Sequence, residues 1–191
     1  DMAAALVREL LSRHPEAAAG EIDDLILGCA MPEGEQGMNM GRVAALRAGL
    51  PDSVPGMTVN RFCSSGLQTI ALAAERIRGG GADAIFAGGA ESMSLIPAAG
   101  RKMAPNPWLM EHLPEIYINM GLTAENVSRK FDVSREDADA FSYASHAKAA
   151  AAQDAGRFDD EIVPLDVEFV TASNGQPKRT ALRFDKDEGV R

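Results

Sequence analysis

Cysteine is scarce in this chain of 191 residues, which contains only Cys29 and Cys63. A disulfide framework needs denser cysteine usage, and a zinc site needs more ligands than two cysteines and three scattered histidines provide. Apolar runs of 18 or more residues are also lacking, and a membrane-spanning helix requires such a run. We therefore expect a fold held together by packing, without a bound metal or cofactor and without membrane association.

Positive charge is in deficit as well. The chain has 28 acidic and 19 basic residues, for a net charge of −9. A nucleic-acid backbone would be repelled on average, and no basic cluster with interleaved aromatic residues offers a local exception, so nucleic acid is not an expected partner.

The first residues mix acids and an arginine into what would be the apolar part of a secretion signal, so a cytoplasmic protein is expected.

The first half of the chain alternates helical and strand patterns. Short apolar, glycine-containing runs predict buried strands, and amphipathic runs predict helices between them. This order favours an α/β fold with a largely parallel sheet. The predicted helices span residues 2–12, 39–50 and 64–78, and the predicted strands span 24–30, 57–60 and 84–90, with Asp1 placed to cap the first helix.

The second half of the chain begins with a segment that lacks the regular apolar pattern of the first half. Residues 93–120 contain four prolines and no clear periodicity, which is typical of a functional loop or a domain boundary. Two helices are expected next, one opened by Thr123 and one capped by Ser134 and ended by Gly156. A turn is predicted at residues 173–177. The inward stripe of the second helix is predicted to consist of Ala138, Phe141, Ser145, Ala149 and Ala152.

Cys63 is the main candidate for chemistry. It lies between a predicted strand and the N-terminus of a predicted helix, and no charged residue occurs from 62 to 74. Free backbone N–H groups and the helix dipole favour a thiolate there, and the same groups could hold a developing oxyanion. The small residues Ser64, Ser65 and Gly66 would let a substrate approach the sulfur. The alternative is an inert cysteine that packs in the core, as cysteine often does.

Six segments carry a resemblance to a known family. The string VNRFCSSGLQ at residues 59–68 and the string AGGAESMS at 87–94 resemble the nucleophile and following-strand signatures of the thiolases. The remaining segments occur in the thiolase order: NMGLTAEN at 119–126, SREDADAF at 134–141, DEIVP at 160–164 and DEGVR at 187–191. The resemblance extends from one end of the chain to the other.

The resemblance implies a particular architecture. Thiolases consist of two similar halves stacked as five layers, α-β-α-β-α, with the nucleophile helix in the middle layer. Residues 1–92 would form the N-terminal core half that carries the nucleophile, without its first strand, and residues 93–191 most of an inserted loop domain that covers the active site. By the same resemblance the activating histidine and a second, acid/base cysteine belong to a C-terminal half, so this polypeptide alone is expected to be inactive.

The resemblance also implies an activity. Cys63 would be the nucleophile that takes the acyl group of a 3-ketoacyl-CoA, its backbone N–H would contribute to the oxyanion hole, and Asn119 and Met120 would line the substrate. Coenzyme A would be a co-substrate. A degradative 3-ketoacyl-CoA thiolase of fatty-acid β-oxidation is expected, with acetyl-CoA C-acetyltransferase or a non-catalytic lipid-binding relative as alternatives.

A homodimer, or a dimer of such dimers, is implied in the same way, with the strand at residues 57–60 pairing across the two-fold axis. Cys29 matches no catalytic cysteine of the family and is expected to pack in its strand. His14, His112 and His146 match no catalytic histidine and are expected to be solvated.

Overall fold

A computed structural model describes residues 1–173 and 176–190 of the chain, which forms two compact units, Asp1–Ala104 and Pro105–Arg191. The predicted turn at 173–177 has its central residues, 174 and 175, outside the described part. The expected division between residues 92 and 93 stays a prediction, and the segment from 93 to 104 belongs to the first unit. No helix among the described residues is long and apolar enough to cross a membrane.

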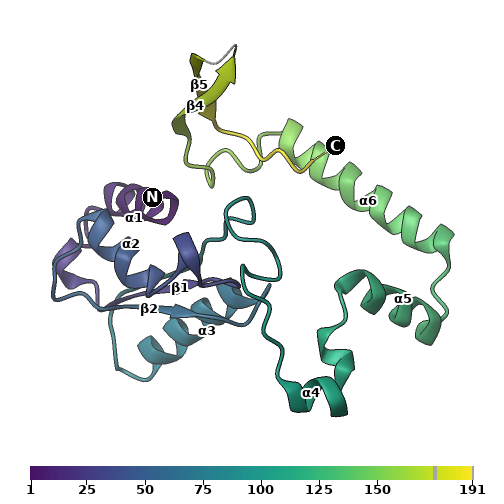
Figure 1. Cartoon of the computed structure of the whole chain (residues 1–191). Coiled ribbons are helices and arrows are strands. Elements are labelled where there is room, and N and C mark those ends of the chain that lie inside the picture. The colour runs from purple at the N-terminus through teal and green to yellow at the C-terminus, as the bar shows by residue number, and fades with distance from the viewer. Residues whose placement is uncertain (174–175, 191) are drawn as a thin grey trace. The chain divides into compact units, whose positions relative to one another are not determined.

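A three-stranded parallel sheet organises the first unit (Figure 1), and its strand order is β2-β1-β3. The central strand β1 (Asp24–Gly28) is buried at all five positions and pairs with β2 (Gly56–Val59) on one side and β3 (Ile85–Gly89) on the other. Strands buried on both faces are near-continuous apolar runs rather than alternating ones, and β1 has this pattern. The three predicted strands are confirmed.

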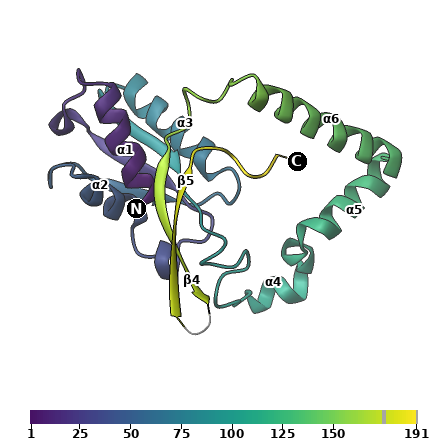
Figure 2. The same ribbon diagram turned by 90° about the horizontal axis from the view of Figure 1, so that it is seen from above.

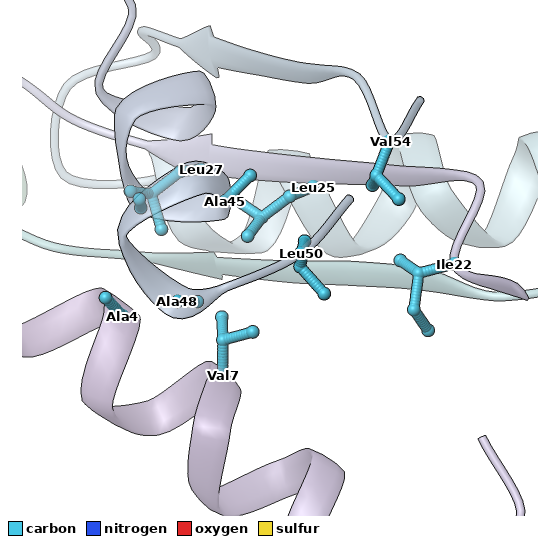
Figure 3. Packing of buried hydrophobic residues seen from close by; sticks show 10 residues of the cluster. Ala4, Val7, Ile22, Leu25, Leu27, Ala45, Ala48, Leu50 and Val54 are labelled. Atoms are coloured by element: carbon cyan, nitrogen blue, oxygen red, sulfur yellow. The ribbon is translucent and has the colours of Figure 1, made fainter. Parts of the chain in front are cut away.

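One face of the sheet is covered by two helices, α1 (Met2–Arg13) and α2 (Met40–Ala48), as Figure 3 shows in close view. The odd-numbered residues of β1 point to this face because successive side chains of a strand alternate. A single apolar cluster results, and its buried members are Ala4, Val7, Ile22, Leu25, Leu27, Ala44, Ala45, Ala48, Leu50 and Val54.

The opposite face is covered by α3 (Ser65–Arg78). Gly28 permits the close approach of this helix, because a Cβ at that position would lie 2.6 Å from the carbonyl carbon of Ser65. At the other end of β1, the Asp24 carboxylate pairs with the Arg76 guanidinium at 2.6 Å. The first unit thus has an α/β/α arrangement, and α3 begins one residue after its predicted start and ends at the predicted residue.

The outer face of α3 carries exposed apolar side chains within the first unit. Leu67 is 71% exposed and Ile70 is 54% exposed, on the side away from the sheet. The five-layer prediction places a further layer against this helix, and it stays a prediction.

The cap of α1 and the segment after β3 both differ from expectation. Asp1 precedes α1, but its side chain makes no capping hydrogen bond and instead pairs with Arg47 at 2.9 Å. The long segment after β3 is also less irregular than expected, since it contains α4 (Pro107–His112) and a 3-10 turn at Pro114–Tyr117.

The second unit contains two longer helices. The first, α5 (Met120–Phe131), begins three residues before Thr123, because the Asn119 side chain accepts the N–H of Leu122 and so starts the helix earlier. The second, α6 (Arg135–Asp154), is capped by Ser134, whose oxygen accepts the N–H of Asp137. It ends as predicted at Gly156, which has φ +65° in a Schellman-type turn.

A hairpin follows that the sequence pattern did not predict. The strands β4 (Leu165–Ser173) and β5 (Gln176–Phe184) pair antiparallel along their length and lie side by side in Figure 2. None of the described residues from 105 to 190 is buried. The expected inward stripe of α6 stays a prediction: Ala149 and Ala152 are half-buried, whereas Phe141 is 79% exposed.

Candidate active site

The carboxyl ends of the three parallel strands meet at one edge of the sheet of the first unit. Cys29 and Ala30 follow β1, Asn60 follows β2, and Glu91 lies two residues after the end of β3. Ligands of open parallel sheets bind preferentially outside this edge, because the loops that follow the strands converge there. The residues singled out in the sequence around Cys63 lie in the loop that leaves β2.

Cys63 itself is a free, exposed thiol directly before the N-terminus of α3. The preceding residue, Phe62, has φ +47° although its ring is 64% exposed. This left-handed conformation costs a non-glycine residue about 1–2 kcal/mol. Hydrogen bonds hold it: the Phe62 carbonyl accepts the Ser65 N–H at 3.0 Å and the Ser65 hydroxyl at 2.6 Å. The predicted strand-turn-helix position of Cys63 is confirmed.

Several backbone donors at the start of α3 are free. The first N–H groups of a helix have no partner within the helix. Here the N–H of Ser64 reaches the Arg61 carbonyl, and Ser64 gives no side-chain cap. The N–H groups of Cys63, Gly66 and Leu67 make no hydrogen bond within residues 1–173 and 176–190. Free donors beside an exposed sulfur are what a developing oxyanion requires.

Glu91 lies at the centre of a second group of contacts. Its carboxylate accepts the Ala30 N–H at 2.6 Å, the Gln36 side-chain amide at 2.7 Å and the Met31 N–H at 3.3 Å. Burial acts to raise the pKa of Glu91, but these hydrogen bonds outweigh burial and hold its pKa below the ordinary value. Glu91 is therefore an anion at neutral pH and is poorly suited to act as a general acid.

Cys29 is the contrasting cysteine. It is 1% exposed, as expected for a packing residue, and its sulfur lies 3.7 Å from a Glu91 oxygen. Burial, together with the Glu91 charge, raises the pKa of the Cys29 thiol. A buried thiol that ionises less readily is a poor nucleophile, so the two cysteines have opposite environments.

Asn119 and Met120 belong to the second unit, at the start of α5. The Asn119 side-chain oxygen is used as the helix cap, while its Nδ2 group makes no hydrogen bond within the described residues. The Met120 side chain is 71% exposed and is not part of a core in this unit. Both side chains are thus accessible, and their role toward a substrate stays a prediction.

The histidines show no shared site. His14 contacts Glu16 at 2.9 Å, and His112 stacks on Trp108 with ring centroids 4.4 Å apart, and both residues are exposed as expected. Among the described residues, no group of three or more acidic, cysteine or histidine side chains could hold a metal ion.

Comparison with known proteins decides the family. The sequence profile described as "Thiolase, N-terminal domain" matches residues 1–191. The chain belongs to the thiolase family. The α/β fold with a parallel sheet is accordingly that of the thiolase N-terminal domain, and the resemblance noted in the sequence is confirmed.

Individual thiolases match over the whole chain. It is 52% identical to the 3-ketoacyl-CoA thiolase of Bacillus subtilis over 192 residues, which cover 100% of this chain and 49% of the relative. It is 40% identical to the acetyl-CoA acetyltransferase of Pseudomonas aeruginosa, again with 100% and 49% coverage. A beta-ketoadipyl-CoA thiolase of Acinetobacter baylyi is 42% identical, with 100% and 50% coverage. The chain spans about half the length of these curated relatives.

The sequence pattern singled out Cys63 but missed the Glu91 contacts. Glu91 stands in the AGGAESMS string, yet nothing in that string indicates that its partners are Ala30, Met31 and Gln36, which lie at least 55 residues earlier. A carboxylate directly after a buried strand was the available signal, since such a group faces the edge where loops converge.

Proposed function

We propose that this chain provides the nucleophile of a 3-ketoacyl-CoA thiolase, an acetyl-CoA C-acyltransferase that shortens 3-ketoacyl-CoA in fatty-acid β-oxidation. The observation that supports it most directly is the exposed Cys63 thiol beside the free N–H groups at the start of α3. The 52% identity to a relative named 3-ketoacyl-CoA thiolase favours this substrate class over the alternative.

The proposed reaction has two steps. The Cys63 thiolate attacks the 3-keto carbon, and the Cys63 N–H stabilises the resulting oxyanion. The bond between carbons 2 and 3 then breaks, its electron pair leaves on the acetyl-CoA carbon, and that carbon takes up a proton. The acyl group is left on the Cys63 sulfur as a thioester. In the second step the thiol of coenzyme A attacks this thioester, releases the shortened acyl-CoA and restores Cys63.

Other parts of the proposal concern groups around the nucleophile. Asn119 and Met120 would contact the pantetheine or acyl end of the substrate, a role supported by their accessibility. The proton donor would be the second cysteine of the family, and a histidine would assist it. By the resemblance, both residues belong to the C-terminal half of a thiolase. The protein is proposed to be cytoplasmic.

A homodimer is proposed as well. The strand β2 is an edge of the sheet, so its outward backbone groups, apart from the Gly56 carbonyl that accepts from Asn39, could pair with a second copy. Met57, which is 37% exposed on this strand, would contribute apolar contact area.

A second candidate is acetyl-CoA C-acetyltransferase, which would act on acetoacetyl-CoA. The 40% identity to the Pseudomonas aeruginosa relative of that name favours it. Turnover of acetoacetyl-CoA and of a long-chain 3-ketoacyl-CoA by the complete natural polypeptide separates the two: the first proposal expects higher kcat/KM for the long chain.

Replacing the nucleophile tests the central claim. Cys63→Ala in the complete polypeptide is expected to lower thiolysis by about 1,000-fold or more, because the acyl acceptor is lost. Cys29→Ala is the matched control and is expected to retain most of the activity. Acetyl-CoA carrying a labelled acetyl group should modify the wild type at Cys63 only.

Retention of thiolysis by Cys63→Ala would refute the assignment of Cys63 as the nucleophile. If the wild type and Cys63→Ala both bind acyl-CoA and neither turns it over, the lipid-binding alternative is favoured. The 191-residue chain alone is expected to show negligible thiolysis. Robust cleavage by it would contradict the prediction that further catalytic groups are required.

A further inference from the structure

The Asn60 side chain joins the nucleophile loop to the central strand. Its Nδ2 group donates to the Ala30 carbonyl at 3.0 Å, and its Oδ1 accepts the Phe62 N–H at 2.9 Å. Asn60 itself follows β2, so one amide group connects the ends of two neighbouring strands. The chemistry proposed for Cys63 does not use Asn60, whose side chain makes these two hydrogen bonds and no other within residues 1–173 and 176–190.

The Phe62 end of this link controls backbone geometry. Phe62 has the left-handed φ of +47°, which a large side chain adopts only where its surroundings hold it. Its ring is 64% exposed and contributes little packing. The Phe62 carbonyl is held by Ser65, and the Phe62 N–H is held by Asn60. Because Cys63 is the next residue, the orientation of its N–H and its sulfur depends on this held peptide.

The Ala30 end is itself anchored. While the Ala30 carbonyl accepts from Asn60, the Ala30 N–H donates to the Glu91 carboxylate at 2.6 Å. Glu91 also binds Gln36, which is 5% exposed and accepts the Ser92 N–H. A short chain of hydrogen bonds therefore runs from the end of β3 through the end of β1 to the loop after β2.

We propose that Asn60 is a positioning residue for Cys63, which it aims by linking the Phe62 amide to the Ala30 carbonyl that Glu91 anchors. This inference rests on the proposed function of Cys63 as the acyl acceptor. The Cys63 sulfur must reach the carbonyl carbon while the free Cys63 N–H reaches the oxygen of the same carbonyl group, and a displacement of about 1 Å in such a site can lower the rate by about 100-fold. Asn60 touches no substrate atom in this account.

Three variants separate positioning from general stability. Asn60→Ala removes both hydrogen bonds. Asn60→Ser keeps an oxygen able to accept the Phe62 N–H in a local turn, but it is too short to reach Ala30. Asn39→Ala is the matched control, because the Asn39 side chain likewise joins two segments: it accepts the Arg42 N–H at 3.1 Å and donates to the Gly56 carbonyl at 2.7 Å, at the opposite end of β2.

Each variant is made in the complete polypeptide and assayed for thiolysis of a 3-ketoacyl-CoA, for alkylation of Cys63 by iodoacetamide, and for thermal unfolding. We expect Asn60→Ala to lower kcat by about 10- to 100-fold with KM changed less than threefold. Asn60→Ser should recover only a small part of this loss, because it restores the acceptor for the Phe62 N–H but not the link to Ala30. Asn39→Ala should lower the unfolding temperature as much as Asn60→Ala does, yet leave kcat within about twofold.

Four results would overturn the inference: a kcat of Asn60→Ala within twofold of the wild type, an equal loss of kcat in Asn39→Ala, full recovery of kcat in Asn60→Ser, or an unchanged rate of Cys63 alkylation in Asn60→Ala. If Cys63→Ala keeps its activity, the proposed function fails instead. The alkylation rates then still decide whether Asn60 controls the reactivity of Cys63, because an unchanged rate in Asn60→Ala excludes the positioning role.

Discussion

The two units of the chain differ in the interactions that hold their helices and strands in place. In the first, Asp1–Ala104, local elements are held by long-range packing: β1 is buried along its whole length, and helices cover both faces of the sheet. In the second, Pro105–Arg191, the helices have well-formed caps and the hairpin is fully paired, yet no described residue from 105 to 190 is buried. Local hydrogen bonding is sufficient to define elements, but a core is needed to fix side chains.

This difference bears on where chemistry can be built. The arrangement around Cys63 depends on three strand ends that are held in register by the packed sheet. Catalytic groups require such support, because small displacements lower the rate strongly. Within the described part of the second unit, Asn119 and Met120 are supported by the local α5 cap. A substrate-contacting role for them therefore requires contacts that the second unit does not make by itself.

Truncation of core and surface side chains is expected to show the largest contrast between the units. In the 191-residue chain, Leu25→Ala should lower the free energy of unfolding by about 2–5 kcal/mol, because it leaves a cavity in the packed cluster. Phe141→Ala should change it by less than about 0.5 kcal/mol, since the ring is 79% exposed. Urea unfolding followed by circular dichroism measures both. A cost of 2 kcal/mol or more for Phe141→Ala would mean that its ring is buried and would remove the contrast.

A glycine pair tests how closely α3 is seated on the sheet. Gly28→Ala would place a Cβ 2.6 Å from backbone of Ser65, so the helix must shift, and a loss of about 1–3 kcal/mol is expected. Gly66→Ala meets no atom within 4 Å and replaces a helical glycine, so it should be neutral or stabilise by up to about 1 kcal/mol. Thermal unfolding of both variants gives the comparison, and equal effects would contradict the close approach.

The sequence predicted the first unit well and the second only in part. The strands and helices from residue 2 to 89 were predicted because buried parallel strands are apolar runs punctuated by glycine and proline. The start of α6 was predicted because its cap is a local signal at Ser134. The hairpin is not evident from the sequence, although Leu165, Val167 and Phe169 alternate with acidic residues, because its second strand contains a proline and three basic residues. The α5 helix begins three residues before the predicted start because the Asn119 side chain caps it.

The candidate site likewise has one part that the sequence predicts and one part that it does not. Cys63 could be singled out because its position between a strand and a helix is readable from neighbouring residues. The link from Glu91 through Ala30 to Asn60 could not, because it joins residues 30 and 61 positions apart by contacts that exist only once the sheet has formed. Sequence patterns report local geometry, whereas the groups that orient a nucleophile are recruited from neighbouring strands.

Acidification is expected to have the smallest effect, and it tests whether Glu91 supports the first unit as an anion. The hydrogen bonds to its carboxylate hold the pKa of Glu91 below the ordinary value of 4.5. A group whose pKa is lower in the folded state stabilises the fold above its unfolded pKa, and this contribution is lost as the pH falls through the folded pKa. The fold should therefore weaken below about pH 4.5 in part through Glu91.

Glu91→Gln should be less stable at pH 7 and should lose less stability on acidification than the wild type. Glu125→Gln in α5 is the matched control, because the Glu125 side chain makes no hydrogen bond within the described residues. Identical acid profiles for wild type and Glu91→Gln, measured by urea unfolding from pH 7 to pH 3, would show that the strand ends are held without the Glu91 charge.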